Sequence, residues 1–291
     1  MFVSYIVKII IFLSLFFSQA HFSENGIKTS NISDWEVLNK IELENGIVDA
    51  EKAIVVLDNE ISYYSLFENE KQSIASITKL MTALVFLDRN IDLNTVYTIS
   101  SLDQIDGGKR HFFPGEEIIL KDVLYSALVA SDNEAAAILA KATGLSEDDF
   151  MSLMNKKARS LAMFNSSFSD PTGLSSNNIS TAYDVYILFK NAWKNETIKE
   201  ALSLNEYTFS TLQGREKKVI STDSFLLENA NSFPYLEGGK TGYIDEAGYC
   251  FVGSFKIDEK RSAIIVVLNS ETKNSRFTDS LQLARELKEL K

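Results

Sequence analysis

The spacing of apolar positions along the chain predicts where its strands and helices lie. Two β-rich runs within residues 53–67 flank the polar residues 58–60, which is typical of a hairpin. Two further β-rich runs, 248–257 and 261–270, indicate a second hairpin near the end of the sequence. Elsewhere, apolar side chains spaced by three and four residues predict helices over 74–87, 120–130, 133–143, 146–163, 180–195 and 276–291.

This order of elements predicts the fold class. Strands near both ends with helices between them favour one antiparallel sheet into which a helical region is inserted, an α+β arrangement. The 291 residues are enough to bury a sizeable core. We expect one domain over residues 35–291, preceded by a polar linker over 21–34.

The first 20 residues differ from the rest of the chain. Lys8 precedes the apolar run 9–17, and Ser18-Gln19-Ala20 follows it, which is typical of a secretory signal peptide. A buried helix and an uncleaved membrane anchor are the alternatives, and Lys8 within the apolar stretch argues against a spanning segment. The pattern therefore predicts export to the periplasm or cell envelope, with any membrane association made through this segment.

Composition excludes several kinds of partner and site. The net charge of −11 argues against nucleic acid as a partner, because phosphate binding needs clusters of basic residues. The single cysteine, Cys250, cannot form an internal disulfide. Cys250 with the two histidines, His21 and His111, cannot furnish a usual tetrahedral zinc site, so no metal or other cofactor is predicted.

A lysine in an unfavourable position marks the first candidate chemistry. Ser76 and Lys79 are three residues apart at the start of the helix predicted for 74–87, where the helix dipole disfavours a cation. A serine hydroxyl becomes a nucleophile when a neighbouring base takes its proton. A lysine can be that base when burial and nearby positive charge lower its pKa. A solvated surface lysine is the alternative, and a Ser-His-Asp triad would depend on His111 alone.

Two further polar motifs support a catalytic interpretation. Ser131-Asp132-Asn133 lies at the junction of two predicted helices, where an ordinary helix cap is the alternative. The stretch "GGKTG", 238–242, opens a predicted strand, where a glycine-rich turn is the alternative. Together with Ser76-x-x-Lys79, the motifs follow the order S-x-x-K, S-D-N, K-T-G of penicillin-binding proteins and class A β-lactamases.

The surrounding sequence resembles one family more closely. The stretches "ASITKLMTALV", "LVASDNEAAAILA", "FSDPTGLSSNNISTAYD" and "GGKTGYIDEAGYC" are similar to the D-alanyl-D-alanine carboxypeptidases, the low-molecular-mass penicillin-binding proteins. The resemblance extends from about Trp35 to the end. It implies a five-stranded antiparallel sheet with helices on both faces and a mostly helical lobe. The sequence departs from the family pattern at Asp132, at Ile244 and over 221–229.

The resemblance also implies catalytic roles. Ser76 is expected to attack the peptide carbonyl between two D-alanines and to form an acyl-enzyme. Lys79 is expected to accept the proton of Ser76, and Ser131 to relay a proton to the leaving D-alanine. Backbone N–H groups of Ser76 and Tyr243 are expected to form the oxyanion hole.

Substrate binding follows from the same resemblance. Lys240 and Thr241 are expected to hold the terminal carboxylate of the substrate, with help from Arg276, and Asn133 to orient the peptide. The residues expected to bind substrate are Asn133, Lys240, Thr241, Gly242, Tyr243 and Arg276.

The implied activity is that of a serine D,D-carboxypeptidase, which removes the terminal D-alanine from peptidoglycan stem peptides and is acylated by β-lactams. The alternatives are a D,D-endopeptidase that cleaves peptidoglycan crosslinks, a β-lactamase-like hydrolase and a non-catalytic wall-binding relative. A class A β-lactamase uses a further glutamate for deacylation. The corresponding stretch, 163–180, holds Asp170 as its one acidic residue, which argues against rapid β-lactam hydrolysis.

Overall fold

The computed structural model of the protein describes residues 48–58, 60–105, 110–227 and 234–289, all within one compact unit. The predicted signal or anchor segment and the polar linker lie outside these residues. The domain bounds of 35–291 therefore stay a prediction. Among the described residues, no helix is long and apolar enough to cross a membrane.

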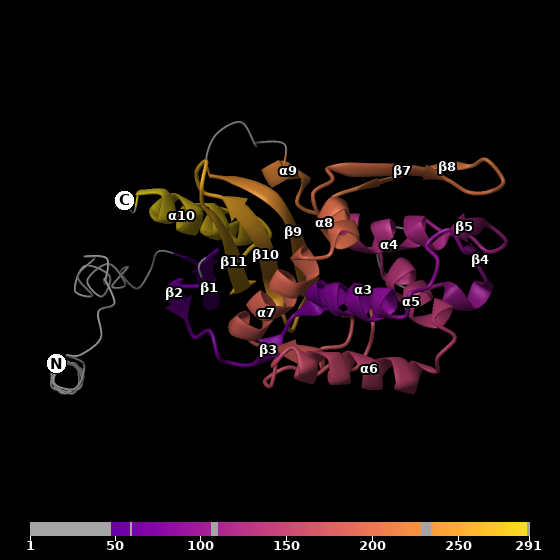
Figure 1. Ribbon diagram of the computed structural model, residues 1–291, viewed down its shortest axis with the longest axis horizontal. Helices are drawn as coiled ribbons and strands as arrows, with labels where there is room; N and C mark the ends of the chain where they lie inside the picture. The colour runs from indigo at the N-terminus through magenta and orange to yellow at the C-terminus, as the bar shows by residue number, and fades with distance from the viewer. Residues whose placement is uncertain (1–47, 59, 106–109, 228–233, 290–291) are drawn as a thin grey trace, which may run out of the picture. The chain divides into compact units, whose positions relative to one another are not determined.

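The centre of the fold is a five-stranded antiparallel sheet (Figure 1). In spatial order its strands are β2 (Ser62–Leu66), β1 (Lys52–Leu57), β11 (Ser262–Ser270), β10 (Gly248–Lys256) and β9 (Tyr235–Ile244). The first hairpin therefore lies beside the last one, although most of the chain separates them. Both hairpins and the α+β fold class predicted from the sequence are confirmed.

Helices form most of the chain between these strands. They are α3 (Lys79–Asp88), α4 (Leu120–Val129), α5 (Asn133–Ala142), α6 (Glu147–Ser160), α7 (Ala182–Trp193), α8 (Glu196–Leu202), α9 (Ser224–Leu227) and, after the sheet, α10 (Ser275–Glu289). Apart from the start of the first helix, each predicted helix is confirmed to within three residues at either end. The short helices α8 and α9 were not predicted.

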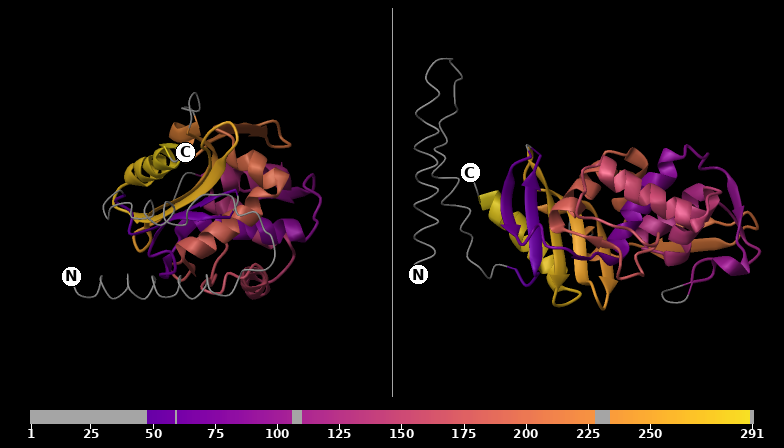
Figure 2. Two further views of the ribbon diagram at one scale, coloured as in Figure 1. Left: turned by 60° about the vertical axis from the view of Figure 1, so that its left-hand side comes forward. Right: turned by 90° about the horizontal axis from the view of Figure 1, so that it is seen from below.

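Apolar residues cover both faces of the sheet. Side chains alternate between faces along a strand, so in β1 Ile54 and Val56 join one apolar cluster while Ala53, Val55 and Leu57 join the other. The helix α10 packs on one face, and α7 packs on the opposite one (Figure 2). This burial on both sides makes the central strands a rigid support for residues on β9.

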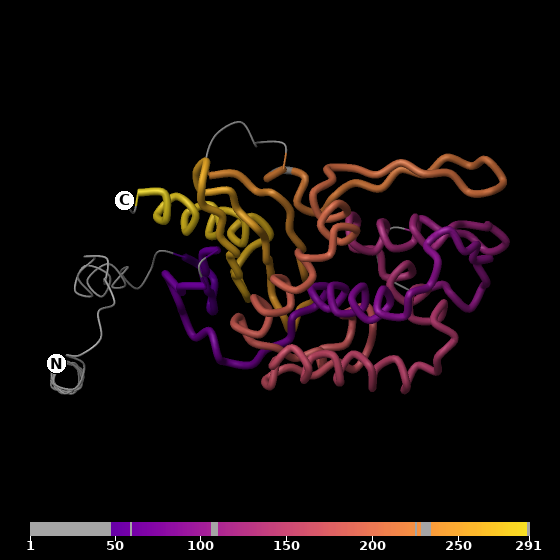
Figure 3. Tube along the Cα trace, viewed as in Figure 1, coloured from indigo at the N-terminus to yellow at the C-terminus, as the bar shows by residue number. Residues whose placement is uncertain are grey.

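Three two-stranded sheets surround the helical region. Their strands are β3 (Gln72–Ser73) with β6 (Ile179–Ser180), β4 (Val96–Thr98) with β5 (Glu117–Ile119), and β7 (Glu206–Ser210) with β8 (Glu216–Ile220). The β7–β8 hairpin contacts α4, and Figure 3 shows it as a long projection of the trace. This hairpin was not predicted, because Phe209 and Val219 are the only buried residues of its two strands and give too weak an alternation.

The predicted continuous helix over 74–87 is wrong at its start. Ala75–Thr78 forms the 3₁₀ helix η1, and α3 begins at Lys79. Ala75 has a φ of +46°, and its neighbour Ile74 donates its N–H to the carbonyl of Asn178. These long-range constraints replace the first α-helical turn, and Ser76 lies within the tighter segment.

The K-T-G motif also lies differently from the prediction. It does not open a strand but occupies the second half of β9, which begins at Tyr235. On β9, Gly242 faces η1, since a Cβ there would lie 2.7 Å from the carbonyl oxygen of Ile74 and 3.3 Å from the nitrogen of Ser76. A glycine is therefore needed for β9 to lie this close to the serine.

Candidate active site

Ser76 and Lys79 form a close pair at the junction of η1 and α3. Nζ of Lys79 lies 2.8 Å from Oγ of Ser76. Ser76 lines a cavity, whereas Lys79 is only 1% exposed and lies behind the cavity wall. The structure thus brings together the predicted nucleophile and its predicted base.

Two further acceptors surround the Lys79 amine. Nζ donates to Oδ1 of Asn133 at 2.7 Å and to the carbonyl oxygen of Thr172 at 2.6 Å. A neutral amine has two N–H groups and one lone pair. When Asn133 and Thr172 accept the two N–H groups, the lone pair remains for the third contact, with Oγ of Ser76, as a general base requires.

Burial lowers the pKa of Lys79 to about 7. Desolvation is the largest cause, because a buried ammonium loses its hydration. The charges of Asp132 and Asp170 act in the opposite direction and limit the shift. The predicted lowering of this pKa by burial is confirmed, whereas the predicted help from nearby positive charge is not, since the charges that act on Lys79 are these two opposing carboxylates.

The carbonyl of Thr172 is held by a turn that the sequence analysis did not identify as part of the site. Oδ1 of Asp170 accepts the N–H groups of Thr172 at 2.6 Å and Gly173 at 2.8 Å. Oδ2 of Asp170 accepts the N–H of Ser175 at 2.9 Å and Nδ2 of Asn178 at 2.9 Å. The "DPTG" sequence, 170–173, was the available signal, because aspartate commonly closes such turns onto its own following backbone.

The S-D-N motif joins α4 to α5. Ser131 lines the same cavity as Ser76 and has a φ of +57°. Oδ1 of Asp132 accepts the N–H of Ala135 at 2.9 Å and caps α5. Asn133, the first residue of α5, contacts Lys79. One short turn therefore places a hydroxyl on the cavity wall and an amide oxygen on the lysine behind it.

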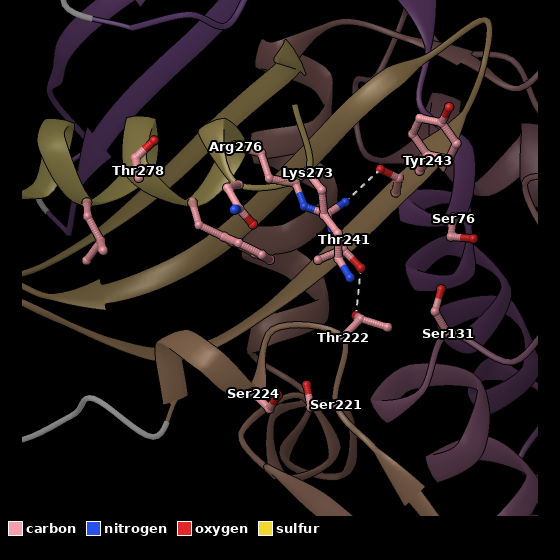
Figure 4. A pocket seen from close by; sticks show the side chains of 14 residues that line it. Ser76, Ser131, Ser221, Thr222, Ser224, Thr241, Tyr243, Lys273, Arg276 and Thr278 are labelled. Atoms are coloured by element: carbon pink, nitrogen blue, oxygen red, sulfur yellow. Dashed lines mark hydrogen bonds between the residues drawn. The ribbon is translucent and has the colours of Figure 1, made fainter. Parts of the chain in front are cut away.

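The β9 strand supplies the opposite wall. Figure 4 shows Thr241 and Thr222 across the cavity from Ser76 and Ser131, and Oγ1 of Thr241 donates to Oγ1 of Thr222 at 2.6 Å. Tyr243 is 47% exposed at the rim, and its ring stacks on Tyr249 with centroids 4.3 Å apart.

Lys240 does not line the cavity but is buried beneath it. Nζ donates to the carbonyl oxygen of Thr241 at 3.1 Å. Burial, followed by the charge of Lys79, holds the pKa of Lys240 well below its ordinary value, and Asp223 opposes the shift. Burial also raises the pKa of Asp223 to about 6. Lys240 does not reach the cavity in this conformation, so its predicted contact with the substrate carboxylate stays a prediction.

Arg276 lines the cavity from α10. Nη1 donates to the carbonyl oxygen of Gly242 at 3.2 Å (Figure 4). The guanidinium carbon lies 4.7 Å from the ring centroid of Phe277 and 5.6 Å from that of Tyr249. These contacts fix a cation that is largely desolvated, which strengthens its interaction with an anionic ligand.

The cavity has a volume of about 730 Å³. Its walls include six predicted site residues: Ser76, Ser131, Thr241, Gly242, Tyr243 and Arg276. They also include residues that were not predicted to belong to the site: Ser221, Thr222, Ser224, Lys273, Asn274, Phe277, Thr278 and Leu281. The fold brings the 221–224 turn, part of the stretch 221–229 that departs from the family pattern, and the start of α10 beside β9.

Several known proteins have sequences similar to this chain. Residues 41–272 match the family described as D-alanyl-D-alanine carboxypeptidase. The chain is 33% identical over 248 residues to the D-alanyl-D-alanine carboxypeptidase DacF of Bacillus subtilis, with 80% of this chain and 61% of that relative aligned. It is 36% identical over 214 residues to a D-alanyl-D-alanine endopeptidase of Haemophilus influenzae, with 72% of each aligned.

Solved structures agree with the sequence comparison. The Streptomyces K15 DD-transpeptidase superposes with a TM-score of 0.77 at 25% identity, covering 84% of this chain and 98% of the other. A D-alanyl-D-alanine carboxypeptidase of Mycobacterium tuberculosis gives 0.75 at 26% identity, covering 83% and 92%. The family and fold predicted from the sequence are confirmed: the chain belongs to the D-alanyl-D-alanine carboxypeptidase family.

Proposed function

We propose that the protein is a serine D,D-carboxypeptidase that removes the terminal D-alanine from peptidoglycan stem peptides. The observation that carries this proposal is the distance of 2.8 Å between Oγ of Ser76 and Nζ of Lys79, with the other two contacts of the amine directing its lone pair at the serine. Because the chain spans 61% of the length of DacF, the activity is inferred from the site rather than taken from that relative.

Acylation starts at Ser76. Its Oγ attacks the carbonyl carbon between the two D-alanines while Lys79 takes the hydroxyl proton. The backbone N–H groups of Ser76 and Tyr243 donate hydrogen bonds to the developing oxyanion. Removing one such donor typically lowers the rate by about 10²–10³-fold. As the C–N bond breaks, the ammonium of Lys79 returns its proton through Ser131 to the leaving amine, so D-alanine departs and Lys79 is neutral again in the acyl-enzyme.

Deacylation reverses the proton transfers. Water attacks the ester carbonyl, a neutral Lys79 accepts the proton of that water, and Oγ of Ser76 is released as a hydroxyl. The anionic tail of the substrate lies against the hydroxyl of Thr241 and the guanidinium of Arg276, because Arg276 gives this wall local positive charge. β-Lactams that carry a carboxylate acylate Ser76 by the same route.

A β-lactamase-like activity is disfavoured by the position of Asp170. Both of its carboxylate oxygens accept hydrogen bonds that hold the turn beneath Lys79. A carboxylate committed in this way cannot activate water for fast deacylation of a β-lactam. We therefore expect slow hydrolysis of the acyl-enzyme formed with penicillin.

A D,D-endopeptidase is the second candidate. The cavity continues along the first turns of α10, where Thr278 and Leu281 line it, and Lys273 lines it just before that helix. A departing D-alanine ends at the carboxylate contacts, whereas the second stem peptide of a crosslink would extend into this additional space. The stem-peptide substrate also requires that the site lies outside the cytoplasmic membrane, in accord with the signal segment predicted for residues 1–20.

Two substrates distinguish the candidates. The protein is incubated with a synthetic peptide ending in D-Ala-D-Ala and, separately, with a crosslinked wall fragment, and the products are identified by mass spectrometry. We expect free D-alanine from the first. A fluorescent penicillin should label the protein covalently on the peptide that contains Ser76, and Ser76→Ala should abolish the label. Cleavage of the crosslink alone would favour the endopeptidase. The absence of both activities, together with labelling that persists in Ser76→Ala, would reject both candidate functions.

The pKa of Lys79 sets the pH dependence of acylation. Because burial lowers this pKa to about 7, Lys79 is neutral above that pH and protonated below it. Only the neutral amine can accept the proton of Ser76, so the rate of penicillin acylation should fall by about tenfold for each pH unit below the pKa. Stopped-flow acylation measured across this range tests the prediction. A rate that does not change through pH 7 would show that another group accepts the proton.

A further inference from the structure

One titratable pair beside the site has no part in the proposed mechanism. Nδ1 of His111 lies 2.6 Å from Oδ2 of Asp132, and the two side chains are 10% and 2% exposed. Asp132 stands between Ser131, which lines the cavity, and Asn133, which contacts Lys79. His111 comes from the segment before β5, so the contact joins two separate parts of the helical region.

The carboxylate of Asp132 has a second task. Oδ1 accepts the N–H of Ala135 at 2.9 Å at the start of α5, and the backbone N–H of Asp132 donates to the carbonyl of Ser126 at 3.3 Å in α4. An ionised carboxylate has no hydrogen to donate, so the hydrogen in the contact with His111 belongs to Nδ1. Rotating the turn would therefore break the helix cap and the imidazole contact together.

The turn needs such support. Ser131 has a φ of +57°, in the left-handed region that is unfavourable for residues other than glycine. Because this residue is the serine expected to relay a proton, relaxation to an ordinary φ would move its hydroxyl away from Ser76. The buried contact of the neighbouring Asp132 with His111 opposes that relaxation.

His111 is itself fixed from the other side. Its carbonyl oxygen accepts a hydrogen bond from Nζ of Lys217, on β8, at 2.9 Å. The same Nζ contacts both carboxylate oxygens of Glu116 at 2.8 and 2.9 Å, and Glu116 accepts the N–H of Phe113 at 3.0 Å. The β7–β8 hairpin thus holds the segment that carries His111, and the imidazole transmits this restraint to Asp132.

We propose that His111 is a positioning residue for the S-D-N turn: through Asp132 it holds Ser131 and Asn133 in register with Ser76 and Lys79. It does not line the cavity, and it exchanges no proton with the substrate. This role rests on the proposed function, because it is measured as acylation of Ser76.

Substitutions at His111 separate the hydrogen bond from the shape of the ring. His111→Phe keeps a ring but removes the Nδ1 donor, and His111→Gln places its amide nearer the position of Nε2. His111→Asn returns an N–H near the position of Nδ1. We expect the phenylalanine and glutamine variants to lose up to about 100-fold in the acylation rate constant at saturating penicillin. The asparagine variant should recover most of that rate.

A matched control removes a comparable contact from the same helix. Lys141, near the end of α5, donates to Oδ1 of the buried Asp103 at 2.7 Å, far along the helix from the S-D-N turn. Lys141→Met should lower the melting temperature without slowing acylation. Circular dichroism and thermal unfolding test whether each variant is folded. If His111→Phe does not fold, His111→Gln is compared with the parent protein in its place.

Three results would overturn the proposal. The first is a folded His111→Phe or His111→Gln variant that is acylated at the parent rate. The second is a His111→Asn variant that is acylated as slowly as those two variants. The third is a variant at His111 that changes the affinity for penicillin but leaves the acylation rate at saturation unchanged. Failure of the proposed function gives a different result, because the parent protein itself would then not be acylated.

Discussion

Lys79→Arg is expected to reduce the acylation of Ser76 by about 10²–10⁴-fold, the contribution typical of a general base. Arginine keeps a cation and N–H donors for Asn133 and the carbonyl of Thr172, which now lie 2.7 and 2.6 Å from the amine. A guanidinium stays protonated at any accessible pH, so it has no lone pair for the hydroxyl of Ser76. The pH-dependent rise in rate near 7, which we assign to Lys79, should disappear together with the activity.

The fold of this variant must be checked separately from its chemistry. Position 79 is almost completely buried, and a permanent charge there is less favourable than a lysine that can become neutral. We therefore expect a lower melting temperature with native circular dichroism at 25 °C. The control is Lys141→Arg, because Lys141 lies at the end of α5 away from Asn133. This variant should be acylated at the parent rate. A folded Lys79→Arg protein that captures penicillin at the parent rate would reject Lys79 as the base.

Local periodicity explains which parts of the fold could be predicted. The runs 248–257 and 261–270 became β10 and β11 because nearly continuous apolar strands need two covered faces, and α7 and α10 provide the cover. Ser76 and Lys79 could be paired because three residues of helix place them on one face. The other two motifs were recognisable from short sequence patterns whose order along the chain is itself informative.

The remaining features depend on contacts between distant segments. The positive φ of Ala75 arises where Gly173 and Gly242 bring two other backbones against η1, and no pattern within 74–87 encodes their approach. The acceptor from Thr172 is a backbone carbonyl, which any residue type supplies. Likewise, Asp132 reads as a simple cap in the sequence, and its partner His111 becomes apparent only when the helical region is folded.

Gly173→Ala is the other change with a large expected effect, and it acts through the backbone. Gly173 has a φ of +83°, and a Cβ there would overlap the carbonyl of Ala75 and lie 2.8 Å from the nitrogen of Ser76. Backbone strain and overpacking are each worth about 1–3 kcal/mol, so we expect a loss of about 2–6 kcal/mol in the free energy of unfolding. Urea denaturation measures it.

Gly144→Ala separates strain from the clash. Gly144 has a φ of +73°, but a Cβ there meets no atom within 4 Å, so its substitution should cost only the backbone strain of about 1–3 kcal/mol. The excess loss in Gly173→Ala then reports how tightly the 170–173 turn packs on η1. Relief of the clash must move either Ser76 or the carbonyl of Thr172, which lies 2.6 Å from Nζ of Lys79. The acylation rate should therefore fall in Gly173→Ala and stay unchanged in Gly144→Ala. Equal stability losses in the two variants, with acylation preserved in both, would mean that the turn can yield without disturbing the serine and the lysine.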